Sequence, residues 1–322
     1  MLQQTQVAAV IPYYARFVAA FPDLRALAAA PLERVLELWS GLGYYSRARN
    51  LHRCAIEIAA NHNGEFPRDP EHVAELPGIG RSTAAAICAF AFGVRAPILD
   101  GNVKRVLARH AGIDGYPGER TVENALWALA TERMADAGVE AYTQGVMDLG
   151  ATICVRMRPL CAACPVADDC VARATGRTQA LPAPRPKKPL PQRAVTMLLA
   201  VRHEAVLVER RAPTGIWGGL WSLPELPEAM PADAYCRARF GASVEAARPL
   251  SAIEHGFTHF RLTITPQPVR VVRWDESADE PGTLWLPLAD VGTAALPAPI
   301  KKLLVALAGR ASGANRTLEL LQ

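Results

Sequence analysis

The chain has 322 residues, of which 50% are apolar, with a formal net charge of +4 and a pI of about 8.7. This length predicts roughly two domains with ordinary cores, and the weak basic balance permits a nucleic-acid partner without indicating one. The first residues lack the basic and apolar stretches of a signal peptide, and the longest nearly apolar run, residues 84–94, is too short to span a bilayer. We therefore expect a cytoplasmic protein that neither enters nor binds a membrane.

Residues 1–175 carry apolar residues at helical spacing, with Pro and Gly between the segments and almost no alternating strand pattern. This half is predicted to be all-α. Glu37 falls on an ordinary amphipathic helix, where a carboxylate is expected on the solvated face. The predicted helices cover residues 24–38, 51–60, 74–92, 103–111, 122–137 and 142–153.

Two glycine turns interrupt the helical half. The first contains Gly41 and Gly43, ends at Tyr44 and opens a helix that carries Arg47 and Arg49. Tyr44 has two interpretations. It packs in the core, as most aromatic side chains do, or it wedges into a base stack, where an aromatic face replaces a neighbouring base.

The second turn lies in L-P-G-I-G-R-S-T, residues 76–83, which contains Gly78, Gly80 and Ser82. Two glycines let the backbone turn tightly and bring N–H groups close to a ligand, and the next helix points its N-terminus the same way. Such an arrangement suits a phosphate. An ordinary glycine turn is the alternative, but we favour the hairpin of helix–hairpin–helix DNA-binding proteins.

Asp100 stands just ahead of a predicted helix in I-L-D-G-N-V-K-R, residues 98–105. An Asp in this place is usually a helix cap. The second interpretation is a carboxylate at the mouth of a cationic pocket, where it stabilises a sugar oxocarbenium ion. On statistics alone the cap is favoured.

Four cysteines form the run C-x6-C-x2-C-x5-C near mid-chain: Cys154, Cys161, Cys164 and Cys170. Zinc sites usually combine two short Cys pairs, or Cys pairs with His pairs, and this run has one short pair and no nearby His. A [4Fe–4S] cluster held by four thiolates fits better. Structural zinc is the weaker alternative, and two disulfides require an oxidising compartment.

Residues 176–193 differ from both flanks, because five prolines fall between Pro182 and Pro191. They predict an extended, semi-rigid linker. Residues 156–193 contain eight Lys and Arg residues and only two Asp residues. This excess of positive charge indicates either solvated surface or a phosphate-binding stretch.

The pattern after the linker predicts a small α/β domain that starts with a hairpin, its turn at His203 and Glu204. Predicted strands cover residues 194–202, 205–209, 221–223, 261–265, 269–274 and 283–286, and predicted helices cover 233–240 and 299–307.

These motifs together resemble the endonuclease III superfamily of base-excision DNA glycosylases. Within it, M-L-Q-Q-T-Q-V at residues 1–7, G-L-G-Y-Y at 41–45, M-D-L-G-A at 147–151 and the Pro-rich linker are similar to the MutY family of adenine glycosylases. The resemblance implies a multidomain fold. An all-α helix–hairpin–helix glycosylase domain with a [4Fe–4S] loop at 154–170 covers residues 1–175. A basic linker follows at 176–193, and an α/β Nudix-like 8-oxoguanine-recognition domain covers 194–310.

The resemblance also implies an enzyme that removes adenine mispaired with 8-oxoguanine or guanine in double-stranded DNA, after the adenine leaves the base stack. In the family a Glu protonates the base, an Asp stabilises the sugar cation, and water attacks. Asp100 matches that Asp, and Asn102 matches the residue that supports it. Gln4 and Tyr44 match residues that enter the helix around 8-oxoguanine. We expect the protein to act as a monomer.

Two positions depart from relatives in this superfamily. Ser82 stands where glycosylase/lyases carry a Schiff-base Lys, and since a hydroxyl forms no imine, the resemblance implies a monofunctional enzyme rather than a lyase. The family's catalytic Glu would fall two residues before Met1, and Glu37 does not replace it. We favour a start upstream of Met1. The alternative is a DNA-binding fragment with impaired catalysis, because general acid–base help is worth about 10²–10⁴-fold.

The segment W-G-G-L-W-S-L-P-E, residues 217–225, resembles the Nudix-like domain with which the family checks the opposite base. No Nudix carboxylate box for Mg²⁺ occurs between Gly218 and Val244, so we expect no pyrophosphohydrolase activity. The family's aromatic–Ser–His reading loop matches Phe257, Thr258 and His259, where Thr keeps the hydroxyl and adds a methyl group. A surface His at a strand edge is the alternative for His259.

Overall fold

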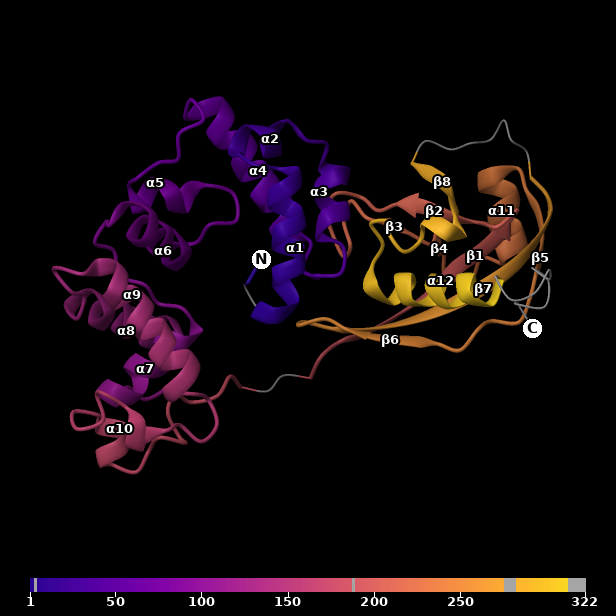
Figure 1. The fold of residues 1–322 in the computed structure, drawn as a ribbon. Helices are drawn as coiled ribbons and strands as arrows, with labels where there is room; N and C mark the ends of the chain where they lie inside the picture. Colours follow the sequence, from indigo (N-terminus) through magenta and orange to yellow (C-terminus); the bar gives the residue numbers. More distant parts are fainter. Residues whose placement is uncertain (3–4, 187–188, 275–281, 312–322) are drawn as a thin grey trace. The chain divides into compact units, whose positions relative to one another are not determined.

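The computed structural model describes residues 1–2, 5–186, 189–274 and 282–311, with side chains described up to residue 309 (Figure 1). The chain divides into two compact units. The first combines Met1–Ile56 with Pro189–Gln322, and the second is Glu57–Lys188. Within the described residues, no helix has both the length and the apolar character that a membrane crossing needs.

Helices form the N-terminal part of the first unit, and their boundaries correct the prediction. The single helix predicted over 24–38 is wrong, because Ala30 is extended ahead of Pro31, as residues before proline tend to be. Asp23 caps the first of the two resulting helices by accepting a hydrogen bond from the Ala26 N–H at 2.8 Å. An unpredicted helix precedes them and contains Pro12. The helices are α1 Val7–Ala20, α2 Leu24–Ala29, α3 Leu32–Trp39 and α4 Ser46–Asn61.

The second unit is helical throughout its regular elements. Helical spacing runs over residues 74–92, but the glycine turn predicted within it, at residues 76–83, is a hairpin at Gly78 (φ 79°) that separates two helices. The segment predicted over 142–153 ends in a π-helical turn instead of an α-helix. The elements are α5 Pro70–Glu75, α6 Arg81–Phe92, α7 Gly101–Ala111, α8 Arg120–Glu132, α9 Val139–Asp148, the π-helix η1 Leu149–Ile153, the 3₁₀ turn η2 Cys161–Ala163 and α10 Val171–Ala174.

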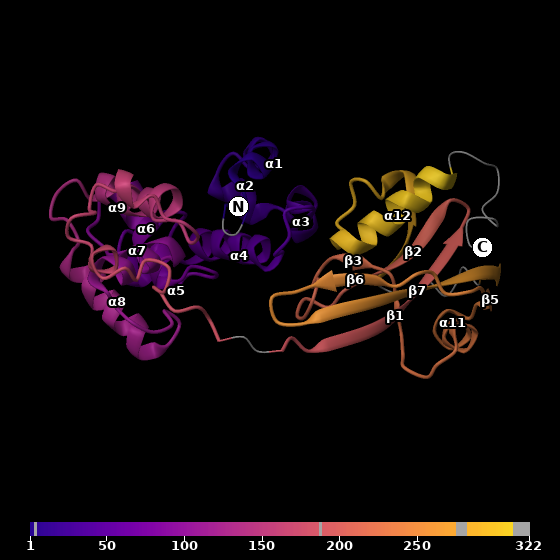
Figure 2. The same ribbon diagram turned by 90° about the horizontal axis from the view of Figure 1, so that it is seen from below.

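The C-terminal part of the first unit is a mixed sheet with the strand order β3-β2-β1-β7-β5. The long strands β1 and β7 run parallel, with Val195 opposite Ile264. Figure 2 shows α11 and α12 on opposite faces of this sheet. The elements are β1 Gln192–Arg202, β2 Ala205–Arg210, β3 Trp221–Ser222, β4 Glu225–Leu226, α11 Ala232–Phe240, β5 Ser243–Ala246, β6 Ile253–Gly256, β7 Arg261–Arg273, β8 Thr283–Pro287, the 3₁₀ turn η4 Leu288–Asp290 and α12 Ala298–Ala311.

The predicted hairpin is confirmed, since His203 (φ 48°) and Glu204 (φ 59°) form the turn between β1 and β2. The break predicted between residues 265 and 269 is wrong. Pro266 and Pro268 lie inside the continuous strand β7, between the segment that pairs with β6 and the segment that pairs with β5. The ladder on that side is interrupted there, so the missing proline N–H groups cost little.

Candidate functional site

The predicted phosphate-binding turn is a tight hairpin between α5 and α6. Its backbone turns at Gly78 and is closed by a hydrogen bond from the Ile79 N–H to the Leu76 carbonyl at 3.1 Å. Gly80 is exposed, lies at the N-cap of α6 and supplies no capping side chain. The hairpin thus presents backbone N–H groups at a helix N-terminus, the arrangement that suits an anion.

Ser82 connects this hairpin to Asp100. The Leu99 N–H donates to Ser82 Oγ at 2.9 Å, one residue before the carboxylate. Asp100 is the N-cap of α7, with its Oδ1 accepting from the Val103 N–H at 2.8 Å. The cap expected on statistical grounds is therefore present, and it orients a carboxylate that is only half-buried.

Asn102 and Arg105 extend the same site along α7. The Arg105 guanidinium donates to Asn102 Oδ1 at 2.8 Å, to the Gly150 carbonyl at 2.7 Å and to the Cys154 carbonyl at 2.7 Å. Burial lowers the pKa of Arg105 without neutralising it, because a guanidinium stays protonated in proteins. One side chain therefore joins the Asp100 end of α7 to the start of the cysteine loop.

The η1 turn brings that loop close to α7. Its last bond runs from the Cys154 N–H to the Leu149 carbonyl, five residues back, at 2.6 Å. Gly150 packs so tightly here that a Cβ would lie 2.6 Å from the Asn102 Cβ. Only glycine allows this approach of the two backbones.

The four cysteines surround a single small hollow of about 30 Å³, together with Arg109, and none forms a disulfide. Arg109 is 3% exposed and donates to the carbonyls of Val155 at 2.7 Å and Leu181 at 2.8 Å, and its Nη1 lies 3.4 Å from Cys154 Sγ. No three or more His, Cys, Asp or Glu side chains in the described residues gather closely enough to hold one metal ion. The four thiols nevertheless line one common hollow.

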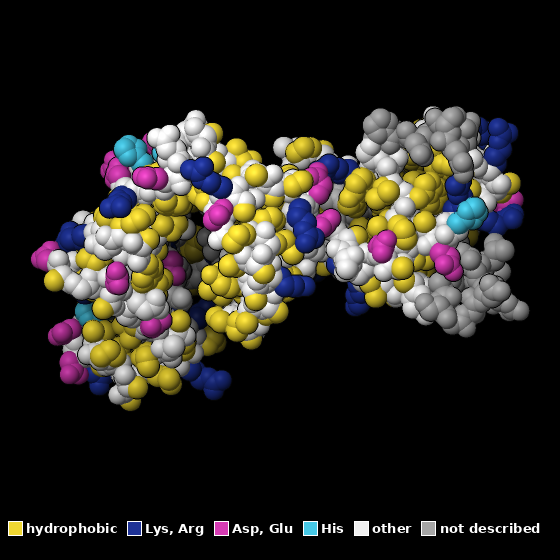
Figure 3. Space-filling model, turned by 45° about the horizontal axis from the view of Figure 1, so that its top comes forward, with side chains coloured by type: hydrophobic (Ala, Val, Ile, Leu, Met, Phe, Trp, Pro, Cys, Tyr) yellow, Lys and Arg dark blue, Asp and Glu magenta, His cyan; other side chains and the backbone are white. Residues whose placement is uncertain are grey.

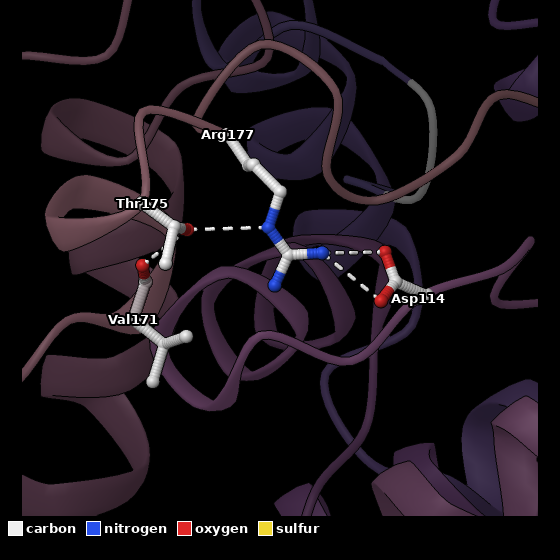
Figure 4. A network of polar contacts seen from close by, with 4 residues as sticks. All are labelled: Asp114, Val171, Thr175 and Arg177. Carbon is white, nitrogen blue, oxygen red and sulfur yellow. Dashed lines mark hydrogen bonds and ion pairs between the residues drawn. The ribbon is translucent and has the colours of Figure 1, made fainter.

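Within the basic stretch of residues 156–193, Arg177 has several partners in its own unit. Arg177 binds both carboxylate oxygens of Asp114, at 2.8 and 3.0 Å, and donates to Thr175 Oγ1, which itself donates to the Val171 carbonyl (Figure 4). On the face drawn in Figure 3, the described Lys and Arg side chains stand singly among acidic and apolar ones. Arg177 is therefore fixed to its own unit, whereas Arg156, Arg158, Arg173, Arg185 and Arg193 are exposed.

The turn at Tyr44 lies in the first unit. Tyr44 adopts φ 47° between Gly43 and α4, is 49% exposed, and lies 5.4 Å from the Arg47 guanidinium. An aromatic ring left this exposed in a strained turn does not serve the core. Gln4 lies outside the described residues. Glu37 is exposed and paired with Arg34 at 3.1 Å, as expected for a solvated face.

The predicted reading loop joins β6 to β7. Phe257 stacks on Phe260 with ring centroids 4.5 Å apart, and its N–H donates to the Phe260 carbonyl at 2.9 Å. Thr258 and His259 are exposed at the tip, with Thr258 Oγ1 3.4 Å from His259 Nδ1. The Thr258 hydroxyl and the His259 imidazole are thus exposed to solvent next to the stacked rings of Phe257 and Phe260.

Sequence reasoning did not single out Arg105, Arg109 or Trp217. The two arginines were given no role, although their spacing of three and seven residues from Asn102 places them on one face of α7. Trp217 was recognised only as part of a motif, whereas its ring lies 5.8 Å from that of Phe257.

Two family profiles match the chain: the HhH-GPD superfamily of base excision DNA repair proteins at residues 1–132 and the NUDIX domain at residues 195–306. The adenine DNA glycosylase of Buchnera aphidicola subsp. Acyrthosiphon pisum is 34% identical over 306 residues, 94% of this chain and 87% of that protein. The human adenine DNA glycosylase is 33% identical over 97% of this chain and 67% of its own length. Among solved structures, a thermostable thymine-DNA glycosylase is 27% identical, covers 54% of this chain and 80% of its own, and has a TM-score of 0.49.

Proposed function

The chain belongs to the adenine DNA glycosylase family, and from this premise we propose that it removes adenine paired with 8-oxoguanine or guanine. As a member of this family it is a base-excision DNA glycosylase that acts on adenine. The observation that carries the proposed catalytic site is the contact path that links the hairpin, Asp100, Asn102 and the cysteine loop within one unit.

The hairpin is proposed to hold the DNA backbone. Gly78 and Gly80 allow its N–H groups to approach a phosphate. Ser82 accepts a hydrogen bond from Leu99 and so holds the loop that ends at Asp100. A fixed backbone contact beside the carboxylate gives the extruded nucleotide a defined position, since the glycosidic bond of a stacked adenine is out of reach.

Asp100 is proposed to stabilise the sugar cation that forms as the bond to adenine breaks. Its cap bond to Val103 fixes the carboxylate before substrate arrives, and a preoriented charge needs no reorganisation in the transition state. The Arg105 bond to Asn102 Oδ1 fixes that amide as well, leaving its NH₂ side to donate hydrogen bonds. Water then attacks the sugar.

A monofunctional reaction is proposed because the hydroxyl at Ser82 cannot form an imine and already accepts a hydrogen bond from Leu99. Borohydride added during turnover is expected to trap no covalent enzyme–DNA adduct. Trapping in good yield contradicts this assignment and favours a bifunctional lyase.

Cys154, Cys161, Cys164 and Cys170 are proposed to hold a [4Fe–4S] cluster, which when bound supplies four iron–thiolate cross-links to the loop. The residues fit, because the thiols surround one hollow and Arg109 donates toward the Cys154 sulfur. Purified protein is expected to contain iron and acid-labile sulfide in nearly equal amounts and to absorb broadly in the visible. Zinc without sulfide contradicts the proposal.

Tyr44, Gln4 and the loop Phe257, Thr258 and His259 are proposed to recognise the base opposite adenine. Support comes from the exposed ring at Tyr44 and from the hydroxyl and imidazole at the loop tip. We also propose the functional division into residues 1–175, linker 176–193 and recognition domain 194–310. It is supported by the two profile matches, although the helices of residues 1–56 pack with the C-terminal part.

The test incubates duplexes carrying A:8-oxoguanine, A:G or A:T pairs and then heats them in alkali, which breaks strands wherever a base is missing. Two proteins are compared: residues 1–322, and the same chain preceded by a segment that places a Glu two positions before Met1. We expect the extended protein to break A:8-oxoguanine and A:G strands and to leave A:T intact. Breakage by neither protein contradicts the proposal.

The second candidate is a DNA-binding protein with impaired catalysis. It is favoured if residues 1–322 bind the mispaired duplex tightly but produce breaks about 10²–10⁴-fold more slowly than the extended protein.

A further inference from the structure

Within the first unit, the helical segment and the Nudix-like sheet share one hydrophobic core. Leu36 and Trp39 of α3 belong to the same buried cluster as Leu220 and Leu296. The turn before α4 is also fastened to the sheet part, because Tyr45 Oη donates to the Leu296 carbonyl at 3.3 Å. The two segments of this unit are therefore one packed body.

A single arginine connects the start of α4 to a turn in the sheet part. Arg49 Nη1 donates to the Gly218 carbonyl at 2.6 Å, and the side chain is half-buried. Its backbone N–H bonds to the Tyr45 carbonyl at 3.1 Å, within the helical turn that Tyr44 opens. A charged donor on a carbonyl makes a stronger bond than two neutral groups.

The turn that accepts this bond has a fixed shape. A Cβ at Gly218 would lie 2.5 Å from the Pro213 carbonyl oxygen and 2.9 Å from that of Ala212. The Gly219 N–H donates to the Arg211 carbonyl at 3.1 Å, and Trp217 is held at φ 57°. The direction of the Gly218 carbonyl is thus coupled to the position of the Trp217 ring.

Trp217 in turn lies beneath the proposed reading loop. It is 7% exposed, and its ring centroid lies 5.8 Å from both His255 and Phe257. His255 meets Phe257 edge to face at 4.7 Å. An unbroken series of contacts therefore runs from Arg49 through Gly218 and Trp217 to Phe257.

We propose that Arg49 is a positioning residue for recognition of the base opposite adenine: through Gly218 and Trp217 it fixes the loop of Phe257, Thr258 and His259 relative to the turn that carries Tyr44. This inference rests on the proposed function. It assigns to a basic side chain on a DNA-binding protein an internal role in place of a phosphate contact.

The test compares three full-length variants. Arg49→Met keeps the length of the side chain and removes the donor, and Arg49→Lys keeps the charge with a shorter reach. Arg53→Met is the matched control, because Arg53 is exposed on the same helix one turn further and loses the same charge. Each is measured for the Kd of duplexes that carry a non-cleavable adenine analogue opposite 8-oxoguanine or opposite guanine.

Arg49→Met is expected to lower the preference for 8-oxoguanine over guanine about tenfold, the size of effect that accompanies loss of one charge-assisted hydrogen bond. Arg49→Lys is expected to give an intermediate loss. Arg53→Met is expected to weaken both complexes equally, as loss of a long-range charge does. If Arg49→Met weakens both duplexes equally, Arg49 is a phosphate contact and the proposal is overturned.

A second measurement keeps the inference separate from the proposed function. Hydrogen exchange of the backbone amides of residues 256–260 in DNA-free protein is expected to be faster in Arg49→Met and unchanged in Arg53→Met. If the unsubstituted protein shows no preference for 8-oxoguanine, the recognition function fails, and this exchange still decides the positioning role. Unchanged exchange in Arg49→Met overturns it. If Arg49→Met does not fold, Trp217→Phe is expected to give the same faster exchange, and normal exchange in that variant overturns the proposal.

Discussion

The centre around Asp100 and the loop at Phe257 are held by different kinds of contact. Arg105 and Arg109 fix the first through hydrogen bonds to backbone carbonyls and to Asn102, with lengths of 2.7–2.8 Å for the bonds to Gly150, Val155 and Asn102. The second is supported by rings, Phe257 against Phe260 and Trp217. Hydrogen bonds depend strongly on distance and angle and so fix the positions of the bonded atoms, whereas ring contacts tolerate small shifts of the side chains. These contacts agree with the proposed roles, bond breaking for the first region and base recognition for the second.

The largest expected effect comes from the carboxylate itself. Asp100→Asn removes the charge and keeps an oxygen that caps α7, so folding is expected to be unchanged. Excision by the extended protein in a single-turnover assay is expected to fall about 10³-fold, as for loss of one preoriented electrostatic group. Binding to the non-cleavable duplex is the control and changes little. A fall of less than tenfold would mean that Asp100 is only a cap.

The packing of Gly150 against Asn102 is expected to be disrupted by a single added methyl group. In Gly150→Ala the new methyl group meets Asn102 at 2.6 Å and forces α7 from η1, which is expected to lower the free energy of unfolding by about 2–3 kcal/mol. Gly145→Ala is the matched control in α9, where nothing lies within 4 Å, and is expected to raise it by about 0.5–1 kcal/mol. Urea unfolding of both measures the contrast, and equal stabilities contradict it.

The loop is expected to respond more gently. Phe257→Leu keeps an apolar side chain but loses the stacking on Phe260, worth about 0.5–1.5 kcal/mol. The preference for 8-oxoguanine over guanine is expected to fall by roughly three- to tenfold, with little change in the melting temperature. Val272→Ala, at a 57% exposed position on β7, is the control. A complete loss of preference would show that the loop is as exacting as the Asp100 centre.

The smallest expected effect is a dependence on pH. Burial lowers the pKa of His255 below its usual 6.5, so the folded protein favours the neutral ring. The contribution of the neutral His255 ring to the free energy of unfolding is therefore fully present above pH 6.5. It is lost as the pH falls through the lower pKa of the folded state. His255→Phe is expected to reduce this acid destabilisation in denaturant titrations between pH 7.5 and 5. An unchanged slope against pH contradicts it.

The features that could be predicted from the sequence are those set by local backbone chemistry. Gly78 produced the expected hairpin, and the turn at His203 and Glu204 lies where β1 and β2 meet. Pro266 and Pro268 misled the prediction of β7, because their tolerance depends on which neighbouring strand stops beside them. Tertiary pairing of that kind leaves no trace in a local pattern.

The site shows the same division. The spacing of the cysteines predicted a common loop, and their thiols surround one hollow. The role of Arg109 was not predictable, since an arginine on an amphipathic helix reads as surface charge and its burial depends on carbonyls up to 72 residues away. Asp100 was correctly placed at a helix start, but the bond between Leu99 and Ser82 required the fold.

The η1 turn determines how the cysteine loop is rotated about the axis of α9. A π-helical turn holds one residue more than an α-helical turn, so everything after it is rotated by roughly 100° compared with a continuous α-helix. That rotation turns the Cys154 carbonyl toward Arg105. Deleting one residue between 149 and 153 would restore a regular helix and aim the loop elsewhere. Homologues should therefore keep the length of this stretch, together with the glycine at position 150, even where its other residues differ.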